Sequence, residues 1–479
     1  MENNSSALTL IKKAIKRSFL PSLVVIGLVS QTNALATESN TPIESQAEIL
    51  SKTIKAFEQK CQTKAWRIWE ASLCGKLLFV NPSTREIYGS AADSESILME
   101  KDDLWVGKLP DNETIANTDK TWAGSRWSMI MLPLPKLMEE RLALIAHESF
   151  HRIQPQLGFE KHASDNGQLS DLEGRYWFLL ELRALASALE AVSSEAYQAQ
   201  LSDHTGESAA LDALRFRAQR YQNYPHAKEN EQKLEFNEGL AEYTGQFVNE
   251  NPNVIKNLVE RLGNADQQET LERSFAYLTG AAYGLLLDHF FDKAATNAPS
   301  EDTSNTSWVG QIDKSFSFSD ALQKALRINR LESNEKHLKQ LGQKYQAEAL
   351  WISEKAKFEA AQARNQKYIA QFVKGKTLRL PIDAIQMSFN PNHVVSLEPY
   401  GKVYQTITVI DRWGKIESEG GLLIAKDFSH IKVNAGSLPS NFQKSGDKVF
   451  ESDGWRLTIN DGWQINAAST GFELIQSGG

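Results

Sequence analysis

A helical sequence pattern runs almost without interruption from about residue 135 to 374, and it limits the fold more than any other feature of this chain. Apolar residues recur there at steps of three and four, the spacing of a helix face that packs on a core. After a first helix near 136–153 we expect helices at residues 171–193, 207–222, 234–250, 252–263, 271–293 and 333–372. Residues 295–307 are polar and small, so a loop is expected there.

Strand patterns lie on both sides of this helical stretch. Before it, a helical pattern at 49–60 is followed by short apolar or β-branched runs at residues 77–80, 85–88 and 123–132. After a break near Gly375, alternating runs occur at residues 377–380, 403–410, 421–425, 431–433, 455–459 and 463–465. The sequence therefore predicts an α+β protein with a mixed N-terminal segment at 37–134, a mostly helical domain at 135–376 and an all-β domain at 377–479.

The first 36 residues have the pattern of an export signal. Four basic residues at 12–17 precede an apolar run at 18–30, which is short for a bilayer span, and the Ala-Leu-Ala of 34–36 has the form of a cleavage site. An uncleaved membrane anchor is the alternative. No later stretch offers 18 uninterrupted apolar residues, so we expect no stable membrane insertion after cleavage and a periplasmic or secreted location.

Cys61 and Cys74 are the two cysteines of the chain. In an oxidising compartment we expect a disulfide between them, with two buried thiols as the alternative. The sequence contains no Cys-x-x-Cys pair, so a bound metal would have to be held by histidine and carboxylate groups.

The charge balance argues against two classes of partner. The chain has 52 basic and 60 acidic residues, or a net charge of −8; residues 1–36 hold four of the basic and one of the acidic residues, which leaves 48 against 59, or −11. A net acidic exported protein lacks the basic surface that nucleic acid or anionic lipid would bind.

The segment His147-Glu148-Ser149-Phe150-His151 places two imidazoles one helical turn apart, with a carboxylate between them. Residues at i and i+4 share a helix face, so both rings can bind one metal ion. Zinc at a catalytic site takes three protein ligands and leaves one position for water, beside which Glu148 would be the general base. The alternative is a pair of hydrogen-bonded core histidines.

A third metal ligand is expected from a second helix, which contains Glu238 and Glu242 at i and i+4. One of these carboxylates can bind the metal while the other accepts the N–H of a ligand imidazole. Gly239, next to Glu238, would permit close approach of this helix and the helix of His147 and His151.

Glu181 is the rival ligand, because a carboxylate among apolar residues needs a partner, either a metal or the neighbouring Arg175 or Arg183. A third reading takes neither residue as a ligand and makes Glu238 and Glu242 a solvated acidic face.

Together the two motifs resemble the gluzincin metallopeptidases, the thermolysin-like clan, in which a helical H-E-x-x-H is followed by a second helix with N-E-x-x-x-D/E. The form E-G-L-A-E-Y is similar to the peptidase MA-like branch. The resemblance implies a zincin-like metallopeptidase domain with zinc bound by His147, His151 and Glu238, with Glu148 as the base and Glu242 supporting a ligand imidazole. It covers two short segments, and the 86 residues between His151 and Glu238 exceed the usual interval, so extra helices would have to be inserted.

An oxyanion that develops during amide hydrolysis needs a hydrogen-bond donor besides the metal. Tyr277 and Tyr283 lie on the next expected helix, where gluzincins often supply a tyrosine, and we expect Tyr283 to act in catalysis. His226 is a weaker option, and each of these residues is also compatible with a purely structural position. The aminopeptidase marker G-x-M-E-N is absent from the sequence.

Residues 124–131 form the expected strand just before the metal-motif helix, and an exposed strand there could hold an extended peptide by strand addition. An ordinary sheet strand is the alternative. The sequence thus predicts an exported zinc metallopeptidase that hydrolyses peptide or protein substrates through Glu-assisted attack of zinc-bound water. The alternatives are an exported helical binding or scaffold protein with a vestigial metal site, and a zinc hydrolase that acts on esters or cell-wall amides.

Overall fold

The computed structural model describes residues 45–62, 68–69, 71–159, 164–195, 204–249, 251–296, 307–331, 334–390, 393–436, 448–452 and 454–477. The predicted export signal at residues 1–36 lies outside these ranges, as does most of the expected loop at 295–307. Within the described ranges, no helix has both the length and the apolar character that crossing a membrane would require.

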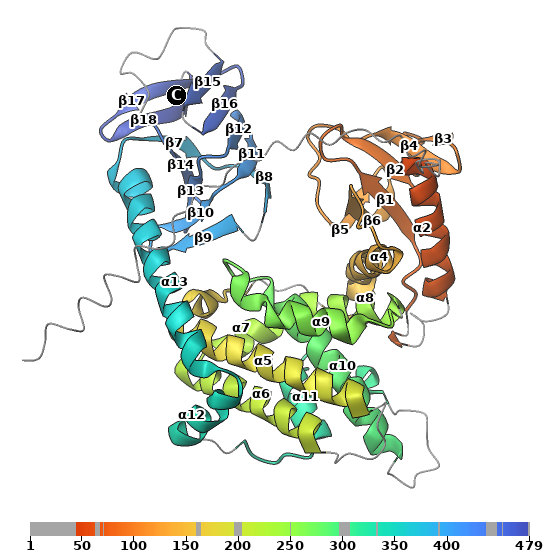
Figure 1. Ribbon diagram of the computed structural model, residues 1–479. Helices are drawn as coiled ribbons and strands as arrows, with labels where there is room; N and C mark the ends of the chain where they lie inside the picture. Colours follow the sequence, from red (N-terminus) through yellow and green to blue (C-terminus); the bar gives the residue numbers. More distant parts are fainter. Residues whose placement is uncertain are drawn as a thin grey trace, which may run out of the picture. The chain divides into compact units, whose positions relative to one another are not determined.

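The N-terminal part combines helix α2 (Gln46–Lys60) with a six-stranded sheet in the order β3-β4-β2-β1-β6-β5 (Figure 1). The strands are β1 (Lys76–Val80), β2 (Glu86–Gly89), β3 (Met99–Lys101), β4 (Leu104–Lys108), β5 (Thr118–Trp122) and β6 (Ser125–Met131). Strands β1 and β6 run parallel, and the other neighbours are antiparallel. Because β1 is buried on both faces, it shows the continuous apolar run that predicted it, whereas the mostly buried β6 also contains Ser125, Arg126 and Ser128.

The expectation that residues 124–131 form an exposed substrate edge is wrong. Strand β6 pairs with β1 on one side and with β5 on the other, so its backbone N–H and C=O groups are engaged in the sheet. Among the described strands, the edge of the sheet beside β6 belongs to β5. Strand β5 escaped prediction because its sequence, Thr-Asp-Lys-Thr-Trp, is mostly polar.

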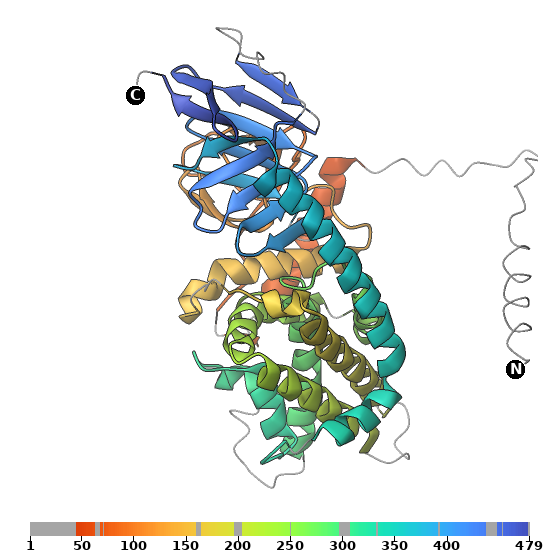
Figure 2. The same cartoon turned by 90° about the vertical axis from the view of Figure 1, so that its left-hand side faces the viewer.

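The helical part contains ten described helices after the sheet. They are α4 (Met138–Ile153), α5 (Leu172–Glu195), α6 (His204–Asn223), α7 (Ala227–Leu234), α8 (Leu240–Asn249), α9 (Val254–Gly263), α10 (Phe275–Thr296), α11 (Phe318–Ala325), α12 (Glu335–Lys344) and α13 (Ala347–Tyr368). Helix α13 lies along α5 (Figure 2). Arg175 of α5 donates to Glu354 at 2.6 Å, and Tyr176 packs on Trp351.

Two of the expected helices are interrupted. The helix expected at 234–250 starts with α7, passes through a five-residue π-helical segment, Glu235–Gly239, and continues as α8. The helix expected at 333–372 is broken into α12 and α13 at Gln346, whose φ of 54° is left-handed. A π-helical segment, Ile369–Lys374, then ends the helical part.

The C-terminal part is all β (Figure 1). A seven-stranded sheet has the order β17-β18-β7-β14-β13-β10-β9, and a five-stranded sheet has the order β15-β16-β12-β11-β8. The strands are β7 (Thr377–Pro381), β8 (Gln386–Phe389), β9 (Val394–Leu397), β10 (Gly401–Tyr404), β11 (Ile407–Asp411), β12 (Gly414–Ser418), β13 (Leu422–Ala425), β14 (His430–Asn434), β15 (Val449–Ser452), β16 (Trp455–Ile459), β17 (Trp463–Ala468) and β18 (Gly471–Gln476). The single strand expected at 403–410 is therefore two strands, β10 and β11, which belong to different sheets.

Separate apolar cores underlie this α+β architecture. The largest joins α2, one face of the N-terminal sheet and the helices, and its fully buried members run from Leu50 to Leu350. A second core, from Leu378 to Leu474, belongs to the C-terminal strands and shares no residue with the first. The other face of the N-terminal sheet has its own small core around Trp127.

Candidate metal centre

Helix α4 is held in the core by its buried side chains. Ile145, Ala146 and Phe150 are fully buried, and the Ser149 hydroxyl lies 3.3 Å from that of Ser128 on β6. His147 and His151 are therefore presented from a helix that packs on the sheet.

Two glycines bring the second helix close to the first and to α10. A Cβ at Gly245 on α8 would lie 2.6 Å from the carbonyl oxygen of Ala143 on α4. A Cβ at Gly280 on α10 would lie 2.2 Å from the Cα of Gly239. The close approach of the two motif helices that was expected at Gly239 is made by Gly245 instead, and Gly239 lies against α10.

His147, His151 and Glu238 form a buried group that could hold a metal ion. The two Nε2 atoms are 3.2 Å apart, and Oε2 of Glu238 lies 3.4 Å from Nε2 of His147 and 3.3 Å from that of His151. Ligands about 2.0–2.1 Å from a tetrahedral zinc ion would be about 3.3–3.4 Å apart. The three atoms thus form a triangle of the size that such an ion needs.

The outer nitrogen of each imidazole also has a polar neighbour. Nδ1 of His147 lies 3.4 Å from Oε2 of Glu242, and Nδ1 of His151 lies 3.1 Å from Oε1 of Gln154. Arg261 donates to the other oxygen of Glu242 at 2.8 Å. Both outer nitrogens can therefore carry the proton, which leaves both Nε2 atoms free to bind a metal.

Burial and the contacts between their charged groups shift the pKa values of His147 and Glu238. Burial lowers the pKa of His147, but its contacts with Glu238 and Glu242 outweigh this effect and raise the pKa to about 10. Burial raises the pKa of Glu238, but the two histidines hold it well below the usual range. The carboxylate is therefore ionised at neutral pH, as a metal ligand must be.

Glu148 is 5% exposed on α4, and its charge contributes to raising the pKa of both His147 and Tyr277. The charge of Glu148 therefore acts on one histidine of the metal-binding group and on a tyrosine of α10.

The structure brings Tyr277, and not Tyr283, to the cluster. The Tyr277 hydroxyl donates to Oε2 of Glu238 at 2.8 Å, and its ring stacks on His147 with 5.3 Å between centroids. The hydroxyl of Tyr283 instead donates to Glu181 at 2.9 Å, in a fully buried position. His226 is exposed just before α7 and is not part of the cluster.

Glu181, the rival third ligand, belongs to a buried ionic network. It accepts hydrogen bonds from Arg217 and Arg220 of α6 at 2.7 Å each. Arg217 also binds Glu235 with two hydrogen bonds, and Arg220 binds Glu231 in the same way. The buried carboxylate of Glu181 is thus paired with two guanidinium groups of α6.

The neighbouring arginines expected as partners of Glu181 bind elsewhere. Arg175 donates to Glu354, and Arg183 donates to the carbonyl of Tyr345.

Sequence reasoning missed Gln154 and Arg261. Gln154 lies three residues after His151, which is the helical spacing for contact with that ring, so its position carried a usable signal. Arg261 comes from α9, and no local pattern connects it with Glu242.

No protein-family model, no curated protein and no solved structure matches this chain. The chemistry of the site therefore has to be argued from its own residues.

Proposed function

We propose that this protein is an exported zinc metallopeptidase of the gluzincin type, which hydrolyses peptide bonds in peptide or protein substrates. The observation that carries the proposal is the triangle of His147, His151 and Glu238, with Glu148 buried beside it. Export accords with the disulfide between Cys61 and Cys74, which persists in oxidising compartments.

Zinc is the metal that the donor set favours. Two imidazole nitrogens and one carboxylate oxygen suit zinc at a catalytic site, whereas calcium and magnesium prefer sites made of oxygen donors. The contacts of Glu242 and Gln154 with the outer imidazole nitrogens are those that metal-bound histidines usually have.

A bound zinc ion would lower the pKa of water and polarise the substrate carbonyl. Glu148 would take the proton from the attacking water and pass it to the leaving amine. Tyr277 would donate a hydrogen bond to the developing oxyanion. Burial and the charge of Glu238 raise the pKa of Tyr277, so its hydroxyl keeps the proton that this role requires.

We propose that an extended substrate binds along β5. Strand β5 contacts the metal-motif helix α4, and among the described strands it is the last of the sheet on that side. A strand in this position can bind an extended peptide by strand addition. Esters and cell-wall amides remain within reach of the same chemistry, and a panel of such substrates beside unfolded peptides would separate them.

The test compares Glu148→Gln with His147→Ala in zinc content and in cleavage of an unfolded protein substrate. Glu148→Gln should keep about one zinc per chain but lose activity by about 10²- to 10⁴-fold, because Glu148 serves the water and not the metal. His147→Ala should lose both. Glu140→Gln, an exposed carboxylate on the same helix, is the matched control and should behave as wild type.

Two results would contradict the proposal. Wild-type activity in Glu148→Gln would refute the mechanism. A wild-type protein that takes up no zinc after zinc-supplemented refolding would instead favour the binding or scaffold protein.

A further inference from the structure

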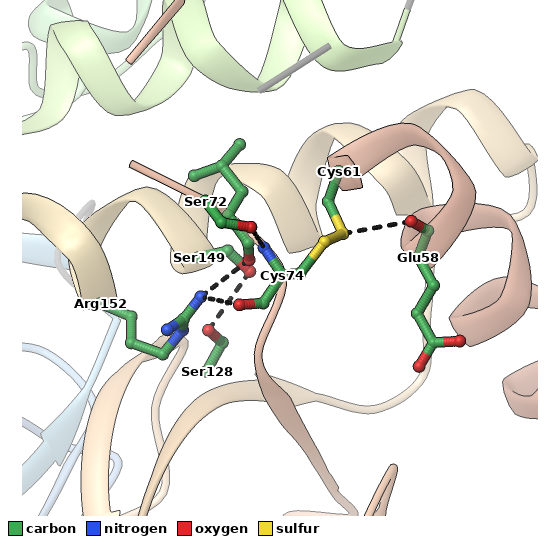
Figure 3. Close-up of a disulfide and its surroundings, with 8 residues drawn as sticks. Glu58, Cys61, Ser72, Cys74, Ser128, Ser149 and Arg152 are labelled. Atoms are coloured by element: carbon green, nitrogen blue, oxygen red, sulfur yellow. Dashed lines mark hydrogen bonds between the residues drawn. A yellow bond between two sulfur atoms is a disulfide. The ribbon is translucent and has the colours of Figure 1, made fainter. Parts of the chain in front are cut away.

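The disulfide between Cys61 and Cys74 closes a short segment between α2 and β1 (Figure 3). The two Cα atoms are 5.3 Å apart. Cys61 directly follows α2, and Cys74 lies two residues before β1, so the disulfide anchors both ends of the segment to regular structure.

Within this segment, Trp69 contacts both helices that carry the metal cluster. Its indole N–H donates to Oγ1 of Thr244 on α8 at 3.0 Å. Its ring packs on that of Phe150 on α4, with 4.9 Å between the ring centroids. The side chain is 3% exposed. Phe150 directly precedes the ligand His151, and α8 directly follows the π-helical segment that contains Glu238. Trp69 therefore bridges the two ligand-bearing segments.

Arg152 ties the end of the same segment to α4. Its guanidinium donates to the carbonyl oxygens of Leu73 and Cys74 at 2.8 Å each (Figure 3). A Cβ at Gly75 would lie 2.4 Å from the guanidinium carbon, so the small residue is needed for the contact. Arg152 directly follows His151, which places this attachment beside a ligand of the cluster.

Metal affinity depends on ligand positions that are held to within about half an ångström. The histidines come from α4 and the carboxylate from another helical segment, so the distance between the two decides whether the triangle closes. The disulfide and Arg152 hold Cys74, and Trp69 contacts both sides of the metal centre.

We propose that Trp69 is a positioning residue of the metal centre: held by the Cys61–Cys74 disulfide and by Arg152, it keeps α4 and α8 at the separation that metal binding requires. This inference rests on the metal binding in the proposed function and adds an element that the zinc motif does not contain. A purely structural role would give a different result, because loss of Trp69 would then lower stability without changing zinc affinity.

Zinc affinity, measured by competition with a chromogenic chelator, tests the inference in the full chain. Trp69→Phe keeps an aromatic ring but removes the N–H donor, and Thr244→Val removes its acceptor. We expect each variant to bind zinc about tenfold more weakly, in the range seen for groups that support metal ligands. The double variant should lose no more than either single one, because both changes break one contact.

Trp413→Phe is the matched control. Trp413 is fully buried in the C-terminal part, and its indole N–H donates to the carbonyl of Pro381 at 2.8 Å. Both tryptophan variants should therefore lower the melting temperature of the metal-free protein, but only Trp69→Phe should weaken zinc binding. Equal zinc affinities in the two variants would overturn the positioning role.

Replacement of Cys61 and Cys74 by alanine tests the anchor without creating thiols that could bind zinc. We expect this double variant also to bind zinc about tenfold more weakly, since Trp69 is then held at one side only. Wild-type zinc affinity in both this variant and Trp69→Phe would refute the inference while leaving the proposed function intact. A wild-type protein without zinc affinity would overturn both.

Discussion

His147 faces Glu238 with one ring nitrogen and Glu242 with the other, at 3.4 Å in each case. An imidazole between two carboxylates is stabilised as the cation, which is why its pKa rises from 6.5 to about 10 despite burial. In the metal-free protein this contribution to stability is complete below pH 6.5 and is lost as the pH rises through about 10.

Zinc uptake near neutral pH should therefore release close to one proton from His147, because a metal-bound imidazole must give up the proton at the binding nitrogen. Zinc affinity should rise with pH up to about 10. Titration calorimetry in two buffers of different ionisation enthalpy measures the released protons. Glu242→Gln should reduce the number, since it removes one of the carboxylates that hold the proton. Uptake of zinc with no proton release in the wild type would contradict this account of the site.

The zinc content of three alanine variants should distinguish the metal ligand Glu238 from the supporting carboxylate Glu242 and from Glu181, which belongs to the buried ionic network. Glu238→Ala should abolish tight binding, and Glu242→Ala should weaken it by about 10- to 100-fold. Glu181→Ala should keep its zinc but lower the free energy of unfolding by about 3–5 kcal/mol, because Arg217 and Arg220 lose a buried partner. An empty site in Glu181→Ala beside an occupied one in Glu238→Ala would reverse the ligand assignment.

The residues of the cluster could be predicted where their spacing carries geometry. His147 and His151 share a face because they are four apart, and Glu238 with Glu242 repeats that spacing. Spacing alone could not predict which tyrosine of α10 contacts the cluster. Tyr277 and Tyr283 are six residues apart on α10 and so point to different sides of the helix, and only the packing of α10 determines which side meets Glu238.

At the scale of elements, the π-helical segment Glu235–Gly239 separates two functions of one helix. Glu231, Glu235, Glu238 and Glu242 would share one face of a regular α-helix, because their spacings are four, three and four. The wider π turn rotates Glu238 and Glu242 about the helix axis relative to Glu231 and Glu235. The first pair then binds the arginines of α6, and the second pair meets the histidines of α4. Apolar periodicity predicts the helix but cannot predict such a change of phase.

The contact between Gly239 and Gly280 should tolerate no side chain. Gly280→Ala would place a Cβ 2.2 Å from the Cα of Gly239, and the helices would have to separate beside Glu238. We expect a loss of about 1–3 kcal/mol in the free energy of unfolding, together with weaker zinc binding. Gly263→Ala is the control, because nothing lies within 4 Å of a Cβ there. Denaturant unfolding and chelator competition measure the two effects, and equal stability of the two variants would contradict the close packing.

For the molecule as a whole, the sequence predicts the α+β class and the order of its parts, because long helical stripes and alternating strands differ in period. It predicts fewer strands than the structure contains. Strands such as β3 and β5 are short and polar, and they are strands only because a neighbour offers a backbone to pair with. The Cys61–Cys74 disulfide, which was predicted from the short spacing and the expected compartment, is confirmed.

The separate cores lead to a prediction about cooperativity. The core of Leu50 to Leu350 and that of Leu378 to Leu474 share no residue, so calorimetry should resolve two unfolding transitions. Zinc at 100 times its Kd should raise the free energy of unfolding of the part that holds the metal site by about 2.7 kcal/mol. The transition of that part should therefore move up by several degrees while the other stays in place, and His147→Ala should abolish the shift. A single transition that moves as a whole with zinc would show that the C-terminal strands unfold together with the helices, and the boundary predicted at residues 376–377 would not separate two cooperative units.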